Sequence, residues 1–256
     1  MASAIVDGLL TANPTAKSDI ICFSASGTSA NLLASRTGIP QAHDLPELLT
    51  DADVVVVAFK PQHLSTADSR LAELTTGKLV VSVLAAKTIE HLASVFPQAR
   101  NIIRTMPNTP SAIGAGITGW SSQKALTAAD RLTIVALLQS VGQHLEVPEI
   151  KIDALMGVSG CGPAFVFEFT GALRDAGIAA GLTSEEAEKL AIETVLGSAR
   201  LMARSPLSPE ALRDQVTSPH GTTYAGLQRL ATHDFRGIMK EVVAAAKARS
   251  IELASA

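Results

Sequence analysis

Short apolar strands alternate with helix-like segments through the first part of this chain, and that alternation limits its possible folds more than any other feature. Residues 54–59 (Val-Val-Val-Val-Ala-Phe), 79–84 (Leu-Val-Val-Ser-Val-Leu) and 101–106 (Asn-Ile-Ile-Arg-Thr-Met) have strand length and little alternation of polar with apolar residues. Helices are expected at 62–75 and 88–95. Strands that are apolar on both faces and separated by helices predict a parallel sheet covered by helices on both sides.

The residues before the first of these strands predict further α/β elements. A helix is expected over residues 1–12, a short strand at 20–23, and a small helix at 45–49. The polar cluster at 24–29 can cap a helix that ends at Gly38.

The second part of the chain changes character. From about Asp153 onward almost no strand pattern is found, and helices are predicted at 164–180, 184–203, 209–216, 222–231 and 235–253. We therefore expect two domains: a Rossmann-like α/β domain over residues 1–150 and an all-α domain over residues 151–256.

Composition excludes several classes of protein. The net charge is −3, so a surface for nucleic acid is not expected. Charged residues make up 18% of the chain, and this low fraction suggests that a partner subunit covers apolar surface. Cys22 and Cys161 have no metal-ligand spacing and the histidines no paired spacing, so neither a metal nor a disulfide framework is expected. With no membrane span and no signal peptide recognised, the expected location is cytoplasmic.

Two polar segments follow predicted strands, at the edge of a parallel sheet where ligands bind. Phe59-Lys60-Pro61 ends one strand, and Lys60 would emerge where a cofactor could pass; a solvated lysine is the alternative. Met106-Pro107-Asn108-Thr109-Pro110 ends another. Its prolines make a rigid turn that presents an amide and a hydroxyl, with an ordinary Asn-type turn as the alternative.

A literal G-x-G-x-x-G occurs at 114–119, but its surroundings do not suit a dinucleotide loop. That loop needs a strand directly before it and a helix directly after it. Here prolines precede the glycines, and an extended segment follows them. Glycines at a turn beside a strand are the favoured interpretation.

Two clusters belong to the helical part. Glycines in the segment 157–165 (Gly-Val-Ser-Gly-Cys-Gly-Pro-Ala-Phe) predict close helix packing. Cys161 is not expected to be a nucleophile, because no histidine pairs with it. Residues 216–223 (Val-Thr-Ser-Pro-His-Gly-Thr-Thr) combine hydroxyls with a helix start, which suits an anion such as a carboxylate. An ordinary helix cap is the alternative, and His220 is either a general acid or simply solvated.

Taken together, the segments 106–110, 157–165 and 216–223, in this order and spacing, resemble the pyrroline-5-carboxylate reductase family. The resemblance implies reduction of 1-pyrroline-5-carboxylate to L-proline by NAD(P)H, the last step of proline biosynthesis. It also implies a Rossmann-like domain followed by a helical domain that forms a homodimer, with decamers in some members.

The resemblance also implies roles for individual residues. The substrate carboxylate would lie at Ser218, Pro219, His220, Gly221, Thr222 and Thr223, and the Thr223 hydroxyl, placed against the imine nitrogen, is the expected catalytic group. The cofactor would lie along Ser24, Ser26, Thr28, Ala58, Phe59, Lys60, Pro61, Ala85, Ala86 and Asn108. No acid follows the strand at 20–23, so NADP is favoured over NAD, with NAD still possible.

The chain departs from the family pattern at several positions. Cys161 and Phe165 stand where serine and tyrosine are usual, and Ala86 and His220 stand where glycine is usual. The chain also begins at what resembles the methionine of the first Gly-x-Gly-x-Met turn, so the first strand and its glycines are expected to be missing. We expect an internally assigned start or a truncation.

Two other functions stay open at this point. One is a related NAD(P)-dependent oxidoreductase acting on another imine or on a 3-hydroxy acid. The other is a truncated, non-catalytic dimerising protein whose nucleotide domain no longer binds a cofactor.

Overall fold

The computed structural model describes residues 1–254, which divide into two compact units. The first comprises residues 1–161 together with the end of the chain from Ala245 onward, and the second comprises Gly162–Ala244. The limits expected from the sequence, 1–150 and 151–256, stay a prediction about functional domains.

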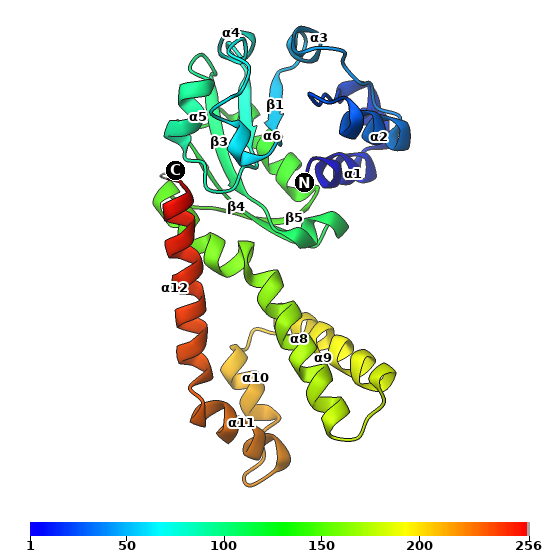
Figure 1. Ribbon diagram of the computed structural model, residues 1–256, viewed down its shortest axis with the longest axis vertical. Coiled ribbons are helices and arrows are strands. Elements are labelled where there is room, and N and C mark those ends of the chain that lie inside the picture. Colours follow the sequence, from blue (N-terminus) through cyan, green and yellow to red (C-terminus); the bar gives the residue numbers. More distant parts are fainter. Residues whose placement is uncertain (255–256) are drawn as a thin grey trace. The chain divides into compact units, whose positions relative to one another are not determined.

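A five-stranded sheet forms the centre of the first unit (Figure 1). Its strands are β1 (Val54–Val57), β2 (Leu79–Ser82), β3 (Asn101–Met106), β4 (Gly116–Ser122) and β5 (Gly142–Glu146), in the order β1-β2-β3-β4-β5. β1, β2 and β3 are parallel, whereas β4 runs antiparallel to β3. The connection at 107–115 is shorter than the dozen or so residues that a parallel crossover needs, so the chain turns back at this point.

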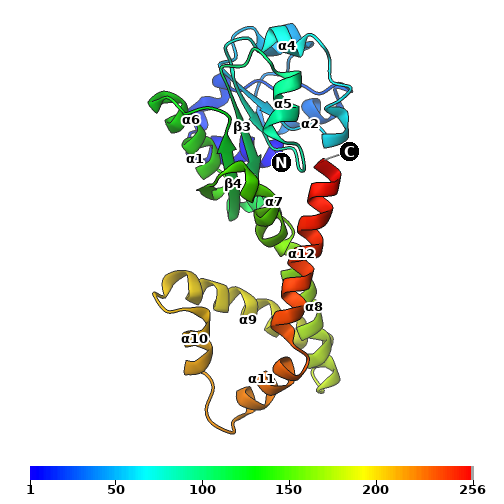
Figure 2. The same cartoon turned by 90° about the vertical axis from the view of Figure 1, so that its left-hand side faces the viewer.

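Both faces of the sheet are buried, as the apolar runs predict. Along β2 and β3, Val80 and Ile102 belong to a core with Leu92 and Phe96 on one face. Leu79, Val81 and Ile103 belong to a second core with Trp120 and Ile134 on the other face. Figure 2 shows α1 and α6 on one side of β3 and α5 on the other. The chain therefore has the Rossmann-like layering expected from its sequence.

The remaining elements of the first unit are short. Its α-helices are α1 (Ala2–Ala12), α2 (Thr28–Thr37), α3 (Leu45–Leu49), α4 (Leu71–Leu74), α5 (Ile89–Val95), α6 (Ala128–Gln139) and α7 (Ile152–Leu155). Single 3₁₀ turns occur at Pro14–Asp19, Pro61–His63, Thr109–Ile113 and Glu149–Lys151, and a π-helical turn at Met156–Gly160.

The second unit is helical, as expected. It contains α8 (Gly162–Ala179), α9 (Ser184–Arg204), α10 (Pro209–Gln215), α11 (Thr222–Thr232) and the first part of α12 (Phe235–Ala254). A capping box starts α9, because the Thr183 and Glu186 side chains each bond the other residue's backbone N–H. Gly177 of α8 lies so close to Ala187 of α9 that an added Cβ would meet the alanine Cβ at 3.2 Å. The two helices thus pack through small residues.

Two expected elements are wrong. The helix expected at 62–75 is reduced to the turn at Pro61–His63 and the short α4. Between them the Asp68 carboxylate accepts a bond from the Arg70 backbone N–H, a local turn that competes with helix. The strand expected at 20–23 is a single parallel bridge between Cys22 and Gln41.

β1 is an edge strand of the sheet. Among the described residues, β1 pairs with β2 on one side and has no strand on its other side. The segment at Cys22 pairs with Gln41 and not with β1.

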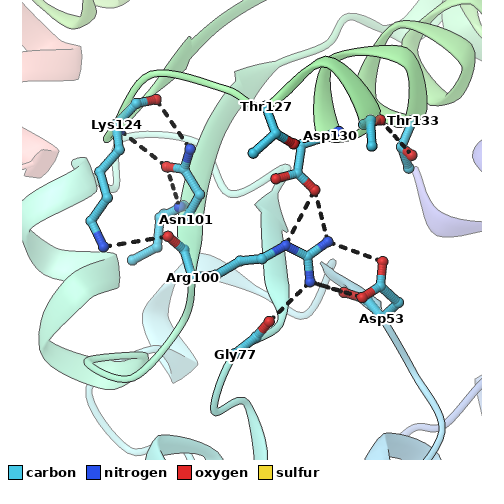
Figure 3. A network of polar contacts seen from close by, with 10 residues as sticks. Asp53, Gly77, Arg100, Asn101, Lys124, Thr127, Asp130 and Thr133 are labelled. Atoms are coloured by element: carbon cyan, nitrogen blue, oxygen red, sulfur yellow. Dashed lines mark hydrogen bonds and ion pairs between the residues drawn. The ribbon is translucent and has the colours of Figure 1, made fainter.

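A polar network joins the amino ends of the three parallel strands (Figure 3). Arg100, directly before β3, donates to Asp130 of α6 at 2.8 Å and to Asp53, before β1, at 2.9 Å. It also donates to the carbonyl of Gly77, before β2, at 2.9 Å. These contacts, chiefly the hydrogen bonds from Arg100, lower the pKa of Asp130.

The unfolding free energy is therefore expected to depend on the charge of Asp130. A carboxyl group whose pKa is lowered by folding stabilises the fold above its ordinary pKa of about 3.9, and this contribution is lost as the pH falls through the lower folded-state value. Asp130→Asn should thus be less stable than wild type at pH 7, and the difference should shrink towards pH 3. Urea unfolding at several pH values measures it. Asp53→Asn, at a far more exposed carboxylate, is the control, and a constant difference across the range would contradict the prediction.

Candidate functional site

The carboxyl ends of β1, β2 and β3 meet at one edge of the sheet. Val57 pairs with Ser82, and Ser82 with Arg104, so the three strands end side by side. The loops at 58–61, 83–88 and 107–109 leave the sheet there. This is the edge at which parallel α/β sheets bind ligands, and it lies opposite the Arg100 network.

The first loop offers exposed side chains. Phe59 and Lys60 are exposed and follow the half-buried Ala58, while Pro61 starts a 3₁₀ turn. An exposed ammonium beside a small residue suits a phosphate or ribose hydroxyl passing along the edge. These four residues are adjacent in the sequence and follow β1, and their contact with a cofactor stays a prediction.

The second loop contains a strained residue. Ala86 is buried and has a φ of 57°, in the left-handed region that glycine favours. Ala85 precedes it and is half-buried. Alanine thus adopts a left-handed conformation at a position where glycine is usual in the family that the sequence resembles.

Ala86→Gly is expected to raise the unfolding free energy by about 1 kcal/mol, because it removes the penalty that a Cβ incurs in this region. Ala85→Gly, in the same loop but without a positive φ, is the matched control and should lower the free energy by a similar amount. Urea unfolding without cofactor measures both. Equal shifts in the same direction would contradict the assignment of strain to Ala86.

In the third loop, the Asn108 side chain links neighbouring segments by hydrogen bonds. Its amide donates to the Ser159 carbonyl at 3.1 Å, and its oxygen accepts from the Ile117 backbone N–H at 3.0 Å. The side chain is buried and joins the end of β3 to β4 and to the π-helical turn. Both polar atoms of the side chain thus have partners within the first unit, and a contact with a cofactor stays a prediction.

The serine-rich turn before α2 has a different arrangement. Ser24 Oγ accepts a bond from Ala30 N at 3.1 Å, and Gly27 has a φ of 73°. Ser26 lies in this turn and Thr28 is the first residue of α2, and both are exposed. Nearby, burial raises the pKa of the Cys22 thiol, which is therefore a poor nucleophile.

The residues expected to bind the substrate lie in the second unit, at the start of α11. The Gly221 N–H bonds back to the Ser218 carbonyl at 3.0 Å, and Gly221 is the residue that precedes the helix. Thr222 and Thr223 form the exposed first turn. His220 has a φ of 59°. The loop and helix start comprise Ser218, Pro219, His220, Gly221, Thr222 and Thr223, whose role in substrate binding stays a prediction; every expected cofactor residue lies in the first unit.

Sequence reasoning missed a buried charged cluster behind the β3 loop. The Arg104 side chain is 3% exposed and contacts Glu149 at 3.0 Å and Asp153 at 3.3 Å. Glu149 also accepts from the Ile89 N–H that starts α5, and Asp153 accepts from the hydroxyl of Ser250 in α12. An arginine inside an otherwise apolar strand was the available signal, since a buried cation needs partners.

Two glycine motifs have different outcomes. Gly114 ends a 3₁₀ turn with a φ of 68°, and Gly116–Gly119 lies in β4, so the literal G-x-G-x-x-G is a turn beside a strand, as expected. In the segment 157–165 the close contact is with a strand and not with a helix, because a Cβ added to Gly160 would approach Cε of Met106 in β3 to 2.9 Å, whereas one added to Gly162 would have nothing within 4 Å. Within residues 1–254, no group of three or more His, Cys, Asp or Glu side chains is arranged to hold a metal ion.

Comparison with known families and proteins gives consistent matches. Residues 149–253 match the family model for pyrroline-5-carboxylate reductase dimerisation, and residues 1–86 match the model for NADP oxidoreductase, coenzyme F420-dependent. The pyrroline-5-carboxylate reductase of Synechocystis is 38% identical over 99% of this chain and 94% of its own length. That of Escherichia coli is 32% identical over 99% of this chain and 94% of its own length.

Solved structures agree with the sequence matches. A pyrroline-5-carboxylate reductase from Coxiella burnetii has a TM-score of 0.91 and 32% identity, covering 98% of this chain and 94% of that one. The Plasmodium falciparum pyrroline carboxylate reductase, crystallised with NADP bound, has a TM-score of 0.85 and 28% identity over the same shares.

Proposed function

The chain belongs to the pyrroline-5-carboxylate reductase family, and on this premise we propose that it reduces 1-pyrroline-5-carboxylate to L-proline with hydride from a nicotinamide cofactor. The observation that supports this most is the 38% identity over 99% of the chain to a pyrroline-5-carboxylate reductase. The matched region includes both the loops at the sheet edge and the loop before α11.

The sheet edge fits a dinucleotide. Small side chains at Ala58, Ala85 and Ala86 leave room for a flat group near the backbone, and Lys60 adds a cation. When bound, the nicotinamide supplies hydride to the imine carbon. The residues of this chain then have to hold the nicotinamide and the imine together and exclude water. Such positioning accounts for a large share of the rate in hydride transfers.

The cofactor is proposed to be NADPH. Ser26 and Thr28 present hydroxyls at the start of α2, and no acid lies in the turn at 24–29, where a carboxylate would select the ribose of NADH. Ser26→Asp is the matching test, because an acid there repels a 2′-phosphate. It should weaken NADPH binding more than NADH binding, whereas Ser35→Asp, near the end of α2, should not discriminate.

The substrate is proposed to bind at the start of α11. The hydroxyls and backbone N–H groups of 218–223 suit the carboxylate, and the Thr223 hydroxyl would hold the imine N–H. An imine is basic enough to be reduced in its protonated form, so this mechanism does not require a covalent nucleophile.

The helical unit is proposed to pair with a second copy of the chain. Many of its large apolar side chains are exposed within one chain, among them Phe167, Leu190 and Leu201. The helical run Glu149–Ala179 has the length and apolar composition of a membrane span, but it lies inside the match to the dimerisation model, which favours a partner chain. Assembly of dimers into decamers and a cytoplasmic location are further proposals.

Three measurements on the purified chain test these proposals. Titration with NADPH and NADH tests cofactor binding. If neither binds, both oxidoreductase functions are excluded, and the non-catalytic dimerising protein is the remaining alternative. Oxidation of NADPH that depends on 1-pyrroline-5-carboxylate is the expected activity. Faster turnover of a different cyclic imine or of a 3-hydroxy acid would favour a related oxidoreductase. Light scattering gives the number of chains.

A further inference from the structure

One acid of the buried charged cluster around Arg104 contacts the backbone at the end of the second sheet-edge loop. Oε1 of Glu149 accepts from Arg104 Nη1 at 3.0 Å and from the backbone N–H of Ile89 at 2.7 Å. Ile89 is the first residue of α5 and directly follows the loop at 83–88. The first N–H of a helix has no acceptor within that helix. Glu149 supplies the acceptor and so links the end of this loop to the segment before α7.

The loop is bonded at its two ends and free in its middle. At its start, the Leu84 N–H donates to Ser82 Oγ at 3.2 Å. At its end it has the bond to Glu149. Between these points, in the part of the chain that the structure describes, the N–H groups of Ala85 and Ala86 donate to no other residue. Free backbone N–H groups at the carboxyl edge of a parallel sheet can donate to a dinucleotide that binds there.

The middle of the loop also needs an anchor. Ala86 is buried with a φ of 57°, and a residue in this region persists when the structure around it holds it. Ile89 follows three residues later, so its bond to Glu149 restrains the part of the loop that leaves Ala86. Arg104 is 3% exposed and also donates to Asp153, so the guanidinium that faces Glu149 has a fixed place in β3. The anchor is therefore built on the buried part of the sheet.

We propose that Glu149 is a positioning residue for the nicotinamide cofactor, an inference that rests on the proposed function. By accepting the Ile89 N–H, its carboxylate keeps the turn at Ala85 and Ala86 in the conformation in which the free N–H groups meet the cofactor. Glu149 acts through the loop and not by touching the cofactor. Without this bond the loop has more conformations, and the cost of ordering it lowers the affinity for the cofactor.

Two variants at Ile89 isolate the bond. Ile89→Pro and Ile89→Ala both remove most of the apolar side chain, but only proline lacks the N–H. Proline suits the first position of a helix, and Thr88 before it has the extended backbone that proline requires, with a ψ of 163°. Ile89→Pro is expected to have a Kd for NADPH about tenfold higher than Ile89→Ala. Its KM for NADPH should rise likewise, while kcat at saturating NADPH stays within about twofold.

Variants at Glu149 test whether the carboxylate acts through this N–H. Glu149→Gln keeps an oxygen that can accept the bond and should retain most of the affinity for NADPH. Glu149→Met removes the acceptor and should raise the Kd about as much as Ile89→Pro does. In the double variant Ile89→Pro with Glu149→Met, the second change should add nothing, because the bond is already lost. Urea unfolding of each variant without cofactor reports stability separately.

The possible outcomes are distinct. Equal Kd values for NADPH in Ile89→Pro and Ile89→Ala overturn the proposal, as do effects that multiply in the double variant. A lower urea midpoint and a lower kcat with an unchanged Kd also overturn it, since Glu149 is then only a structural residue. If wild type binds NADPH but does not reduce 1-pyrroline-5-carboxylate, the proposed substrate fails, whereas the Kd values still decide the role of Glu149. If wild type binds neither NADPH nor NADH, the proposed function and this inference both fail.

Discussion

Thr223→Ala is expected to lower kcat for 1-pyrroline-5-carboxylate about a hundredfold, the scale seen when one precisely placed donor or acceptor is removed from a reacting group. The hydroxyl would hold the imine N–H and so fix the angle at which the imine carbon faces the hydride donor. The Kd for NADPH should not change, because the residues proposed to bind the cofactor lie in the other unit. Steady-state kinetics and cofactor titration measure the two quantities separately.

The fold is not expected to be affected by this change. Thr223 is exposed in the first turn of α11, and alanine favours helix more than threonine does. Thr223→Ser restores the hydroxyl and should recover most of kcat. Unchanged kinetics in Thr223→Ala would remove Thr223 from the mechanism, and a parallel loss in Thr223→Ser would assign it a packing role instead.

The parallel part of the sheet is predictable because strands buried on both faces consist of continuous runs of apolar residues. Residues 54–59 and 79–84 have such runs, and their first four residues form β1 and β2, whereas Phe59 lies beyond β1 and is exposed. The same argument fails for β4 and β5. The residues of β5, at the edge of the sheet, are exposed or half-buried, so this strand has no continuous apolar run. The reversed direction of β4 depends on the length of the connection at 107–115, which an apolar pattern does not reveal.

The segments of the candidate site are recognisable from the sequence because each is local, while their roles in binding stay a prediction. The loops after β1, β2 and β3, and the start of α11, each lie within a few residues that have a recognisable pattern. The strain at Ala86 and His220 could not be derived from the residues, because neither alanine nor histidine signals a positive φ. In the structure Ala86 and His220 both have a positive φ, although neither is glycine.

The Arg104 cluster was missed for a different reason. Its partners Glu149 and Asp153 are 45 and 49 residues away in the chain, and Ser250 is 97 residues from Asp153. No local pattern connects such residues, and each acid taken alone is typical of an exposed helix end. Only the folded chain brings them to one buried guanidinium.

Arg104→Met is expected to lower the unfolding free energy of the α/β unit by about 3 kcal/mol, because it leaves two acids near the core without their cation. Trp120 is the single tryptophan of the chain and lies buried in β4, so its fluorescence follows unfolding of this unit. Urea titrations should be run without cofactor at one protein concentration, because ligand and partner binding both shift the apparent stability. Arg36→Met, at an exposed ion pair with Asp7, is the control and should leave the midpoint unchanged.

Neutralising the acids distinguishes loss of charge balance from loss of packing. In Arg104→Met combined with Glu149→Gln and Asp153→Asn, no unpaired charge remains, so much of the lost stability should return. If the triple variant stays as unstable as the single one, the arginine stem and not its charge stabilises the unit. Because Glu149 also bonds the Ile89 N–H and Asp153 the Ser250 hydroxyl, full recovery requires that the amides keep those two contacts. The cluster would then stabilise the start of α5 and the end of α12 through neutral hydrogen bonds, with the ion pairs needed only while Arg104 is present.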